Sequence, residues 1–360
     1  MKILVVTLLY PLPENPARGV FVDDRVKLLR KLGHDVRVVN PLPRMLRINE
    51  LRRSTLQGVA KAPRISEYED HEIYHPRFTQ LPENIFLKLT KMSVRNKVRK
   101  VEKWLGDWRP DVISCHTLWP IAEIAEKLAN RWDIPWYATV HGFDFDIGLH
   151  TEISKSVINM AKRANKLVAS SQRLADIAND KLNLNRKCDF IPCHTAVPHQ
   201  WVQKLRTYRG HWRRGKLEIL FPANPRRLEK RHMLALKACA ELETRGWNVL
   251  MGGVSNVPRQ LVFDRMLTCD LALITSSRES GPLVAREAIS CGLPVVAVDV
   301  GDLSDWLPEY CIANDESPES IADAIEATIE EGPSHITIPN HFNEEAVGSA
   351  INHLLSNLQS

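Results

Sequence analysis

The sequence predicts an α/β protein built from two doubly wound parallel sheets in tandem, and three observations lead to that fold class. The chain has 360 residues, more than one ordinary hydrophobic core holds. Short apolar runs, typical of strands buried in a parallel sheet, recur along it. Amphipathic helical stretches separate these runs, and strand–helix–strand connections of this kind build parallel sheets through right-handed crossovers.

The first half opens with a strand–loop–helix–strand unit. The run KILVVTLL is expected to be a buried strand rather than a secretory signal, because it is short and is followed by prolines instead of a small-residue cleavage site. A helix with one apolar face comes after a Pro- and Gly-rich loop and stops at Gly33, and DVRVV is the next strand. Further strands of this half are expected at 111–115, 136–140, 166–169 and 188–192.

The same alternation resumes at LEILFP, residues 217–222, and continues to PVVAV. The charged stretch 193–216 between the two halves has no clean period, which predicts a linker with one short helix. We therefore expect one domain over 1–200, a second over 201–340 and a final helix within 341–360.

Composition places the chain among globular proteins, with 44% hydrophobic and 25% charged residues. No apolar run approaches the roughly 18 to 20 residues of a membrane span. The net charge of +5 is compatible with phosphate-bearing ligands or an anionic membrane surface and alone decides neither. Seven cysteines without a C-x-x-C pair indicate reduced thiols and a cytoplasmic location. Cys188, Cys193 and His194 are close in sequence, but we expect small buried thiols there and no metal.

Two glutamates flank the start of a predicted helix. Glu279 follows the apolar run LALITSS, at the carboxyl end of a strand, where open α/β sheets bind ligands. Pro282 suits the first turn of the helix that follows, and backbone N–H groups near Gly281 and Leu283 are ready for an anion. Glu287 lies about a turn and a half further into the helix.

A carboxylate beside an anion site is explained if it binds hydroxyls rather than phosphate. Because a carboxylate accepts two hydrogen bonds, it suits the vicinal hydroxyls of a ribose or a sugar ring. The alternative is a helix with ordinary exposed acids, in which Glu287 pairs with Arg286. Spacing alone favours that alternative.

The stretch ESGPLVAREAISCGLPVV, continued by PVVAVDVGD, resembles the E-x7-E signature of family 4 glycosyltransferases, which are retaining enzymes of the GT-B fold. The resemblance implies two Rossmann-like domains facing a cleft, with the acceptor on the N-terminal side and the nucleotide sugar on the C-terminal side. Glu279 is then expected to contact donor-sugar hydroxyls and Glu287 the nucleotide ribose. Backbone groups of Gly281, Pro282 and Leu283 would contact donor sugar and phosphate. The helix in 341–360 is expected to cross back to the first domain.

The loop after LEILFP carries the cations that the same resemblance requires. Arg227 and Lys230 resemble the family's Arg–Lys pair, which stabilises the departing diphosphate in place of a metal ion. Their spacing is short, so Arg226 remains an alternative to Arg227. A solvated basic loop is the other reading of this stretch.

In the first half, the resemblance covers single residues. Gly19 resembles a glycine that lets the backbone approach the phosphates, although Arg18 replaces the first glycine of the usual pair, and a plain turn glycine is an alternative. His141, at the end of a strand, corresponds to a histidine near the donor sugar. Asp144 and His116 are assigned to the acceptor side, with a structural role as the alternative for His116.

A basic amphipathic helix is predicted over 85–105. It is either a core helix with a solvated face or a contact for anionic lipid at the inner face of the membrane, where a lipid-linked acceptor would lie. No nucleic-acid motif accompanies it.

We thus expect a metal-independent, retaining glycosyltransferase without a cofactor, using a nucleotide diphosphate sugar to build a surface glycan. A nucleotide-sugar epimerase and a non-catalytic nucleotide-sugar-binding descendant stay open as alternatives.

Overall fold

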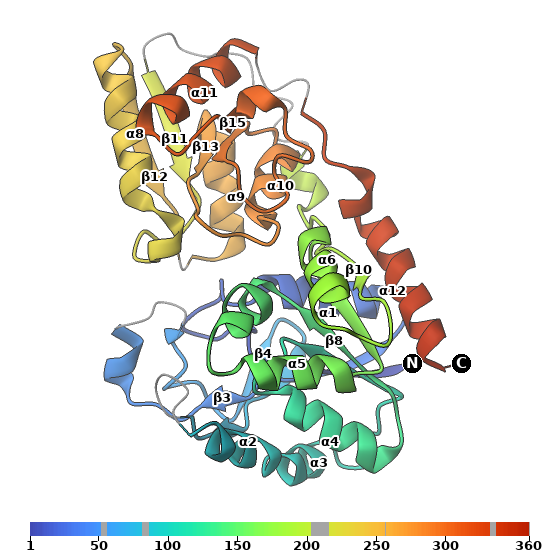
Figure 1. The fold of residues 1–360 in the computed structure, drawn as a ribbon. Helices are drawn as coiled ribbons and strands as arrows, with labels where there is room; N and C mark the ends of the chain where they lie inside the picture. The colour runs from blue at the N-terminus through green and yellow to red at the C-terminus, as the bar shows by residue number, and fades with distance from the viewer. Residues whose placement is uncertain (52–55, 81–85, 203–215, 256, 332–335, 360) are drawn as a thin grey trace. The chain divides into compact units, whose positions relative to one another are not determined.

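The computed structural model describes residues 1–51, 56–80, 86–202, 216–255, 257–331 and 336–359 (Figure 1). The chain divides into two compact units. The first unit comprises Met1–Cys193 together with Glu345–Ser360, and the second unit is His194–Glu344.

The first unit is built on a sheet that is parallel except at one edge. Its strands, in spatial order, are β10 (Asp189–Phe190), β9 (Lys166–Ala169), β8 (Trp136–Val140), β7 (Val112–His116), β1 (Lys2–Thr7), β2 (Asp35–Val39), β5 (His71–Tyr74) and β4 (Ile65–Tyr68). Only β4 pairs antiparallel, with β5. A small parallel pair, β3 (Leu42–Pro43) and β6 (Arg77–Phe78), lies apart from this sheet.

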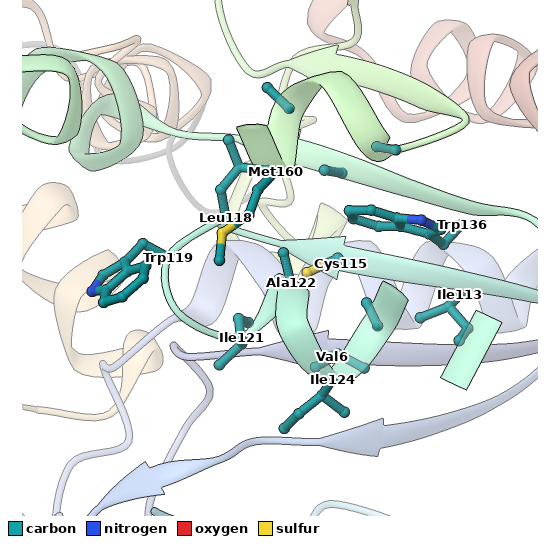
Figure 2. Packing of buried hydrophobic residues seen from close by; sticks show 14 of the residues in the cluster. Val6, Ile113, Cys115, Leu118, Trp119, Ile121, Ala122, Ile124, Trp136 and Met160 are labelled. Carbon is teal, nitrogen blue, oxygen red and sulfur yellow. The ribbon is translucent and has the colours of Figure 1, made fainter. Parts of the chain in front are cut away.

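Helices cover both faces of this sheet, because successive side chains of β1 point to opposite sides. Leu4 and Val6 belong to a buried cluster with α2 (Leu87–Arg95), α3 (Val98–Leu105), α4 (Ala122–Trp132), α5 (Ser154–Arg163) and α6 (Gln172–Lys181). Figure 2 shows part of it around Cys115. Ile3 and Val5 belong to a second cluster with α1 (Val20–Lys31) and α12 (Glu344–Gln359). The C-terminal helix therefore packs on the first unit.

The predicted single helix over 85–105 is wrong, because the structure has two helices there. Asn96 and Lys97 separate α2 from α3, and their amides donate to Met92 and Val94 at 3.0 and 2.9 Å. The tighter turn re-aims the chain so that Val94 and Val98, on different helices, are both buried. The expected apolar face is present, but it is shared between two short helices.

The second unit holds a five-stranded, all-parallel sheet. Its order is β12 (Asn248–Gly253), β11 (Lys216–Phe221), β13 (Leu271–Ile274), β14 (Val295–Val298) and β15 (Ile312–Ala313). The chain steps from β11 to β12 and then crosses back to β13, so the connecting helices lie on opposite faces. Helix α8 (His232–Thr244) packs with α11 (Pro318–Glu331), and α9 (Arg259–Thr268) with α10 (Leu283–Ser290). The reversal makes the carboxyl ends of β11 and β13 neighbours, which is where such sheets bind ligands.

The boundaries of the units differ from the expected residues 200 and 340. The second unit already begins at His194, because Trp201 packs against Phe263 with ring centroids 6.1 Å apart. It extends to Glu344, because Phe342 lies against the guanidinium of Arg286, 4.0 Å from ring centroid to Cζ. The linker expected over 193–216 falls largely on 203–215, outside the described residues.

Candidate active site

The site is centred on a lysine, a glutamate and a serine in the second unit. Lys230 Nζ donates to Glu279 Oε1, and Ser276 Oγ donates to the same oxygen at 2.7 Å. The side chains of Lys230 and Glu279 are only 13% and 16% exposed. With Phe221 and Val284 among their neighbours, they line a small pocket at the carboxyl ends of β11 and β13. The two loops thus place a cation and a carboxylate side by side, both of them residues that the sequence singled out.

The loop that carries Glu279 rests directly on the turn after β14. A side-chain Cβ at Gly281 would lie 2.8 Å from Asp302 Oδ2, and one at Gly301 would lie 3.1 Å from Pro282 Cδ. Gly301 has φ +72°, a conformation that favours glycine. Because no side chain separates the two segments, the turn fixes where the loop starts helix α10.

Helix α10 begins at Leu283, with Pro282 as its N-cap. The first amides of a helix have no acceptor within it, so the amide of Leu283 remains a donor for a ligand, whereas Pro282 has no N–H to give. The positive end of the helix dipole favours an anion at the same place. Pro282 therefore caps the helix instead of occupying its first turn, a shift of one residue from the predicted start.

Glu287 is buried, at 6% exposure, which contradicts the alternative of ordinary exposed acids. Arg259 Nη2, from the first residue of α9, donates to Glu287 Oε1. The guanidinium of Arg259 also lies over the ring of Phe263, 5.4 Å from its centroid. Arg286, proposed as the partner of Glu287, makes its ion pair with Asp302 at 3.1 Å.

The other predicted cations lie differently. Arg227 bonds its neighbour Glu229 through Nε and Nη2, at 2.9 and 2.8 Å. Arg226 is exposed, and its backbone amide donates to Asn224 Oδ1 at 2.9 Å. Of the three, Lys230 is the one that the structure brings to Glu279. Glu229 binds Arg227 because the loop is short and turns the two side chains toward each other.

In the first unit, His116 is the last residue of β7, and His141 directly follows the neighbouring strand β8. Their rings are stacked, with His116 Nδ1 3.3 Å from His141 Nε2. Burial lowers the pKa of His141 to about 3, with the charge of Arg25 acting in the same direction. Burial, with the neighbouring His141 and Arg25, also places the pKa of His116 well below its usual value. Both rings are therefore neutral near pH 7.

Asp144, assigned to the acceptor side, has its carboxylate turned to backbone. Its two oxygens accept from the amides of Leu118 at 2.7 Å and His141 at 3.0 Å, and the residue is 0% exposed. Burial raises its pKa to about 6. Asp144 therefore ties together the loops after β7 and β8 and does not present a carboxylate to a ligand.

Gly19 is required by packing within the chain. It is the N-cap of α1 with φ +66°, and a Cβ there would lie 2.4 Å from the carbonyl carbon of Leu9. Arg18 is buried and donates to the carbonyls of Leu8 and Tyr10. The two residues together shape the loop after β1, which supports the reading of Gly19 as a turn glycine.

Four residues of this region were not singled out from the sequence: Arg231, Ser276, Arg259 and Asp302. Ser276 lies in the quoted run LALITSS and Asp302 ends the quoted PVVAVDVGD, so position beside a strand end could have drawn attention to them. Arg231 and Arg259 come from other segments, and only the tertiary structure shows what they bind.

All seven cysteines are free thiols. Within the described ranges, no group of three or more His, Cys, Asp or Glu side chains is placed to hold a metal ion. None of the helices in those ranges is long and apolar enough to cross a bilayer.

Comparison with known proteins gives the class. The profile of Glycosyltransferase Family 4 matches residues 19–195, and that of Glycosyl transferases group 1 matches residues 251–346. The sheet topologies and these matches define a two-domain glycosyltransferase of the GT-B fold. The chain belongs to the family 4 glycosyltransferases.

Relatives and solved structures agree with this assignment. The chain is 24% identical to TuaC of Bacillus subtilis (strain 168), named as a glycosyltransferase of teichuronic acid biosynthesis, over 90% of this chain and 88% of TuaC. Anabaena HepE in complex with UDP and glucose is 18% identical, with a TM-score of 0.60 over 99% of this chain and 100% of HepE. Sucrose-phosphate synthase from Thermosynechococcus elongatus is 14% identical, with a TM-score of 0.64 over 99% of both chains.

Proposed function

We propose that this glycosyltransferase takes its sugar from a nucleotide diphosphate sugar, works without a metal ion and retains the anomeric configuration. The observation that carries the proposal is the Lys230–Glu279–Ser276 group at the carboxyl ends of β11 and β13, next to the N-terminus of α10. The crystal structure of HepE with UDP and glucose supports a donor of this class.

The roles follow from charge. When the donor binds, Lys230 exchanges Glu279 for the diphosphate, and its benefit grows as the bond to the sugar breaks and negative charge develops. The released carboxylate of Glu279 then accepts hydrogen bonds from donor-sugar hydroxyls. The N-terminus of α10 adds backbone donors for a phosphate, and Glu287 accepts from the ribose. The leaving phosphate helps to take the acceptor proton in a front-face attack, so retention needs no second catalytic carboxylate.

The decisive variants are Lys230→Met and Glu279→Gln, each assayed for transfer from a panel of nucleotide sugars. We expect both to lose activity by at least about a hundredfold, because each removes a group that acts as charge develops. Lys216→Met is the matched control, since Lys216 pairs with Glu218 at 2.8 Å at the opposite end of the same strand, β11. If either site variant has the melting temperature of the parent and still turns over at the parent's rate, the proposed roles are contradicted.

Two further measurements test the finer points. Proton NMR of the product gives its anomeric configuration, and inversion would rule out retention. Activity unchanged by EDTA is the expected result for a reaction in which cations of the protein stabilise the leaving diphosphate. Loss of activity that Mg²⁺ restores would show that a metal takes part.

We also propose that the acceptor is a surface glycan carried on lipid and that α2 and α3 contact an anionic membrane. The name of TuaC supports a glycan acceptor. Phe86, Leu89 and Met92 are 69%, 45% and 60% exposed, a strongly apolar surface for a short helix. The same two helices carry exposed basic residues: Lys88 on α2, and Arg99, Lys100 and Lys103 on α3. Apolar side chains next to cations suit a bilayer with anionic headgroups.

Part of the positive charge is used inside the protein. Arg95 and Lys91 lie 2.5 and 4.0 Å from the buried carboxylate of Glu123 on α4. The membrane test is therefore made on Phe86→Ser with Met92→Ser, using sedimentation with vesicles of phosphatidylglycerol or phosphatidylcholine. We expect the double variant to lose binding to the anionic phosphatidylglycerol vesicles, with no change for phosphatidylcholine vesicles. Met233→Ser, at a 65% exposed position of α8, is the control, and binding independent of lipid charge would contradict the proposal.

A further inference from the structure

Arg231, the residue after the site lysine, has an unusual backbone. It is the N-cap of α8 with φ 50° and ψ 48°, in the left-handed region that non-glycine residues rarely adopt. That conformation is strained for a residue with a Cβ. Contacts of the side chain must therefore hold Arg231 in this place.

The guanidinium spans the two loops of the site. Arg231 Nε donates to the carbonyl of Thr275 at 2.6 Å, and Nη2 lies 3.4 Å from the carbonyl of Ser276. On its outer side, Nη1 meets Glu316 Oε2 at 2.5 Å. A planar fork that serves two consecutive carbonyls and a carboxylate cannot be replaced by the single ammonium of a lysine.

The bonds also run in the opposite direction. The hydroxyl of Thr275, which is 1% exposed, reaches the carbonyls of Lys230 at 2.9 Å and Arg231 at 3.1 Å. Two residues after Thr275, the amide of Ser277 donates to the carbonyl of Glu229, the residue before Lys230, at 2.8 Å. Residues 229–231 are therefore joined to residues 275–277 bond by bond.

Lys230 and Ser276 are the middle residues of these two joined segments, and both donate to Glu279 Oε1. We infer that Arg231 is a positioning residue of the glycosyl-transfer site: it fixes the loop after β11 so that Lys230 stands opposite the Ser276–Glu279 pair. The guanidinium of Arg231 bonds the carbonyls of Thr275 and Ser276 and the carboxylate of Glu316. Arg231 therefore acts through Lys230 and not on the diphosphate. This inference rests on the proposed function of Lys230 and Glu279.

The test variant is Arg231→Gly, because glycine adopts a φ of 50° without strain. The relief of strain offsets part of the lost bonding, so we expect a melting temperature close to that of the parent. We expect kcat to fall at least about tenfold while KM for the donor and the inhibition constant of free nucleoside diphosphate change less than about threefold. Millimolar guanidinium ion should restore part of the activity of Arg231→Gly. The variant Arg231→Lys should have a kcat little higher than that of Arg231→Gly.

Thr275→Val gives a second route to the same answer. It keeps the shape of the side chain and removes the hydroxyl that holds the carbonyls of Lys230 and Arg231, so the same fall in kcat is expected. Thr244→Val is its control, since Thr244 Oγ1 donates to a helix carbonyl, that of Glu241, at 2.7 Å, away from the site.

Each outcome is decisive. Normal kcat in Arg231→Gly and Thr275→Val, with Lys230→Met and Glu279→Gln inactive, overturns the positioning role and leaves the proposed function standing. A large rise in the inhibition constant of the nucleoside diphosphate overturns it too, because it would show that Arg231 binds the diphosphate directly. Activity in Lys230→Met and Glu279→Gln would instead remove the proposed function itself.

Discussion

Arg286 and Asp302 form a buried ion pair under the loop that carries Glu279, with Nη1 3.1 Å from Oδ2. The side chains are 2% and 14% exposed. Asp302 Oδ2 fills the space where Gly281 would carry a Cβ, so the pair contacts the loop directly. Burial raises the pKa of Asp302, and the charge of Arg286 opposes that rise. The start of α10 therefore depends on a charge pair that is largely removed from water.

Breaking this pair is expected to destabilise the second unit strongly. Arg286→Met leaves the carboxylate of Asp302 buried beside an apolar side chain, which should cost about 3–5 kcal/mol. The double variant Arg286→Met with Asp302→Leu should recover most of that loss, because no uncompensated charge remains. Hydrogen exchange of the amides of β13 and β14 measures the free energy of unfolding.

The control for Arg286 is Arg245→Met. Arg245 pairs with Glu241, Asp323 and Glu326 at the surface, where such pairs contribute about 1 kcal/mol or less each. If Arg286→Met destabilised no more than Arg245→Met, the buried pair would not support the loop in the way described.

Gly19→Ala is expected to destabilise the first unit more than its backbone conformation explains. Gly33 also has a positive φ, +87° against +66°, where it ends α1 and the amide of His34 donates back to the carbonyl of Leu29, yet nothing lies within 4 Å of a Cβ built there. Gly33→Ala is therefore the control, and both substitutions cost about 1–2 kcal/mol for the left-handed backbone. Gly19→Ala must in addition push apart the backbone of Leu9 and Tyr10, about 1–3 kcal/mol or more. Equal melting temperatures for the two variants would show that the loop after β1 has room.

Stability is expected to fall as the pH drops below 6.5, partly because of His75. The ring is 0% exposed, lies 2.8 Å from Ser66 Oγ, and burial lowers its pKa to about 4. Between these two pH values the unfolded chain binds a proton that the folded ring does not, so each pH unit favours unfolding by up to about 1.4 kcal/mol. Above 6.5 the contribution is fully present, and it is lost as the pH falls toward 4.

His75→Gln tests this assignment. It should shrink the drop in melting temperature between pH 7 and pH 5 without abolishing it, because burial also lowers the pKa of His71 to about 4 and of His141 to about 3. Asp144 acts in the opposite direction, since its raised pKa makes the folded state take up a proton near pH 6. An identical drop in parent and variant would exclude His75 as a source.

The sequence was sufficient for two doubly wound parallel sheets and for placing Lys230 and Glu279 in loops at the ligand-binding edge of the second sheet. Each follows the carboxyl end of an apolar run, and crossover rules make those ends neighbours. It could not place Arg227, because a two-residue step to Glu229 satisfies the guanidinium locally. Nor could it show that Asp144 faces two backbone amides, since that depends on how two loops from different strands meet.

The basic stretch 85–105 shows a different limit. Its apolar spacing predicts the buried face correctly. The break between α2 and α3 hardly changes the spacing of the apolar residues, so the pattern predicts one helix where there are two. The division of charge within it also depends on Glu123, which comes from another helix. Long-range partners, not local pattern, decide these features.

The pairing of Arg259 with Glu287 leads to the last prediction, which concerns the binding of the donor. Glu287 is proposed to accept hydrogen bonds from the ribose, and Arg259 donates to one of its oxygens. Removing that bond lets the carboxylate turn, so Arg259→Met should raise the donor KM several-fold, by about 1 kcal/mol or more, with kcat nearly unchanged. Glu287→Gln should also raise the donor KM. The double variant should raise it by less than the two single variants combined, because the two residues act as one unit.

Arg265→Met, on the same helix as Arg259, is the control. Donor KM measured under initial-rate conditions decides the matter: an unchanged KM in Arg259→Met beside a raised KM in Glu287→Gln would mean that Glu287 keeps its orientation without Arg259.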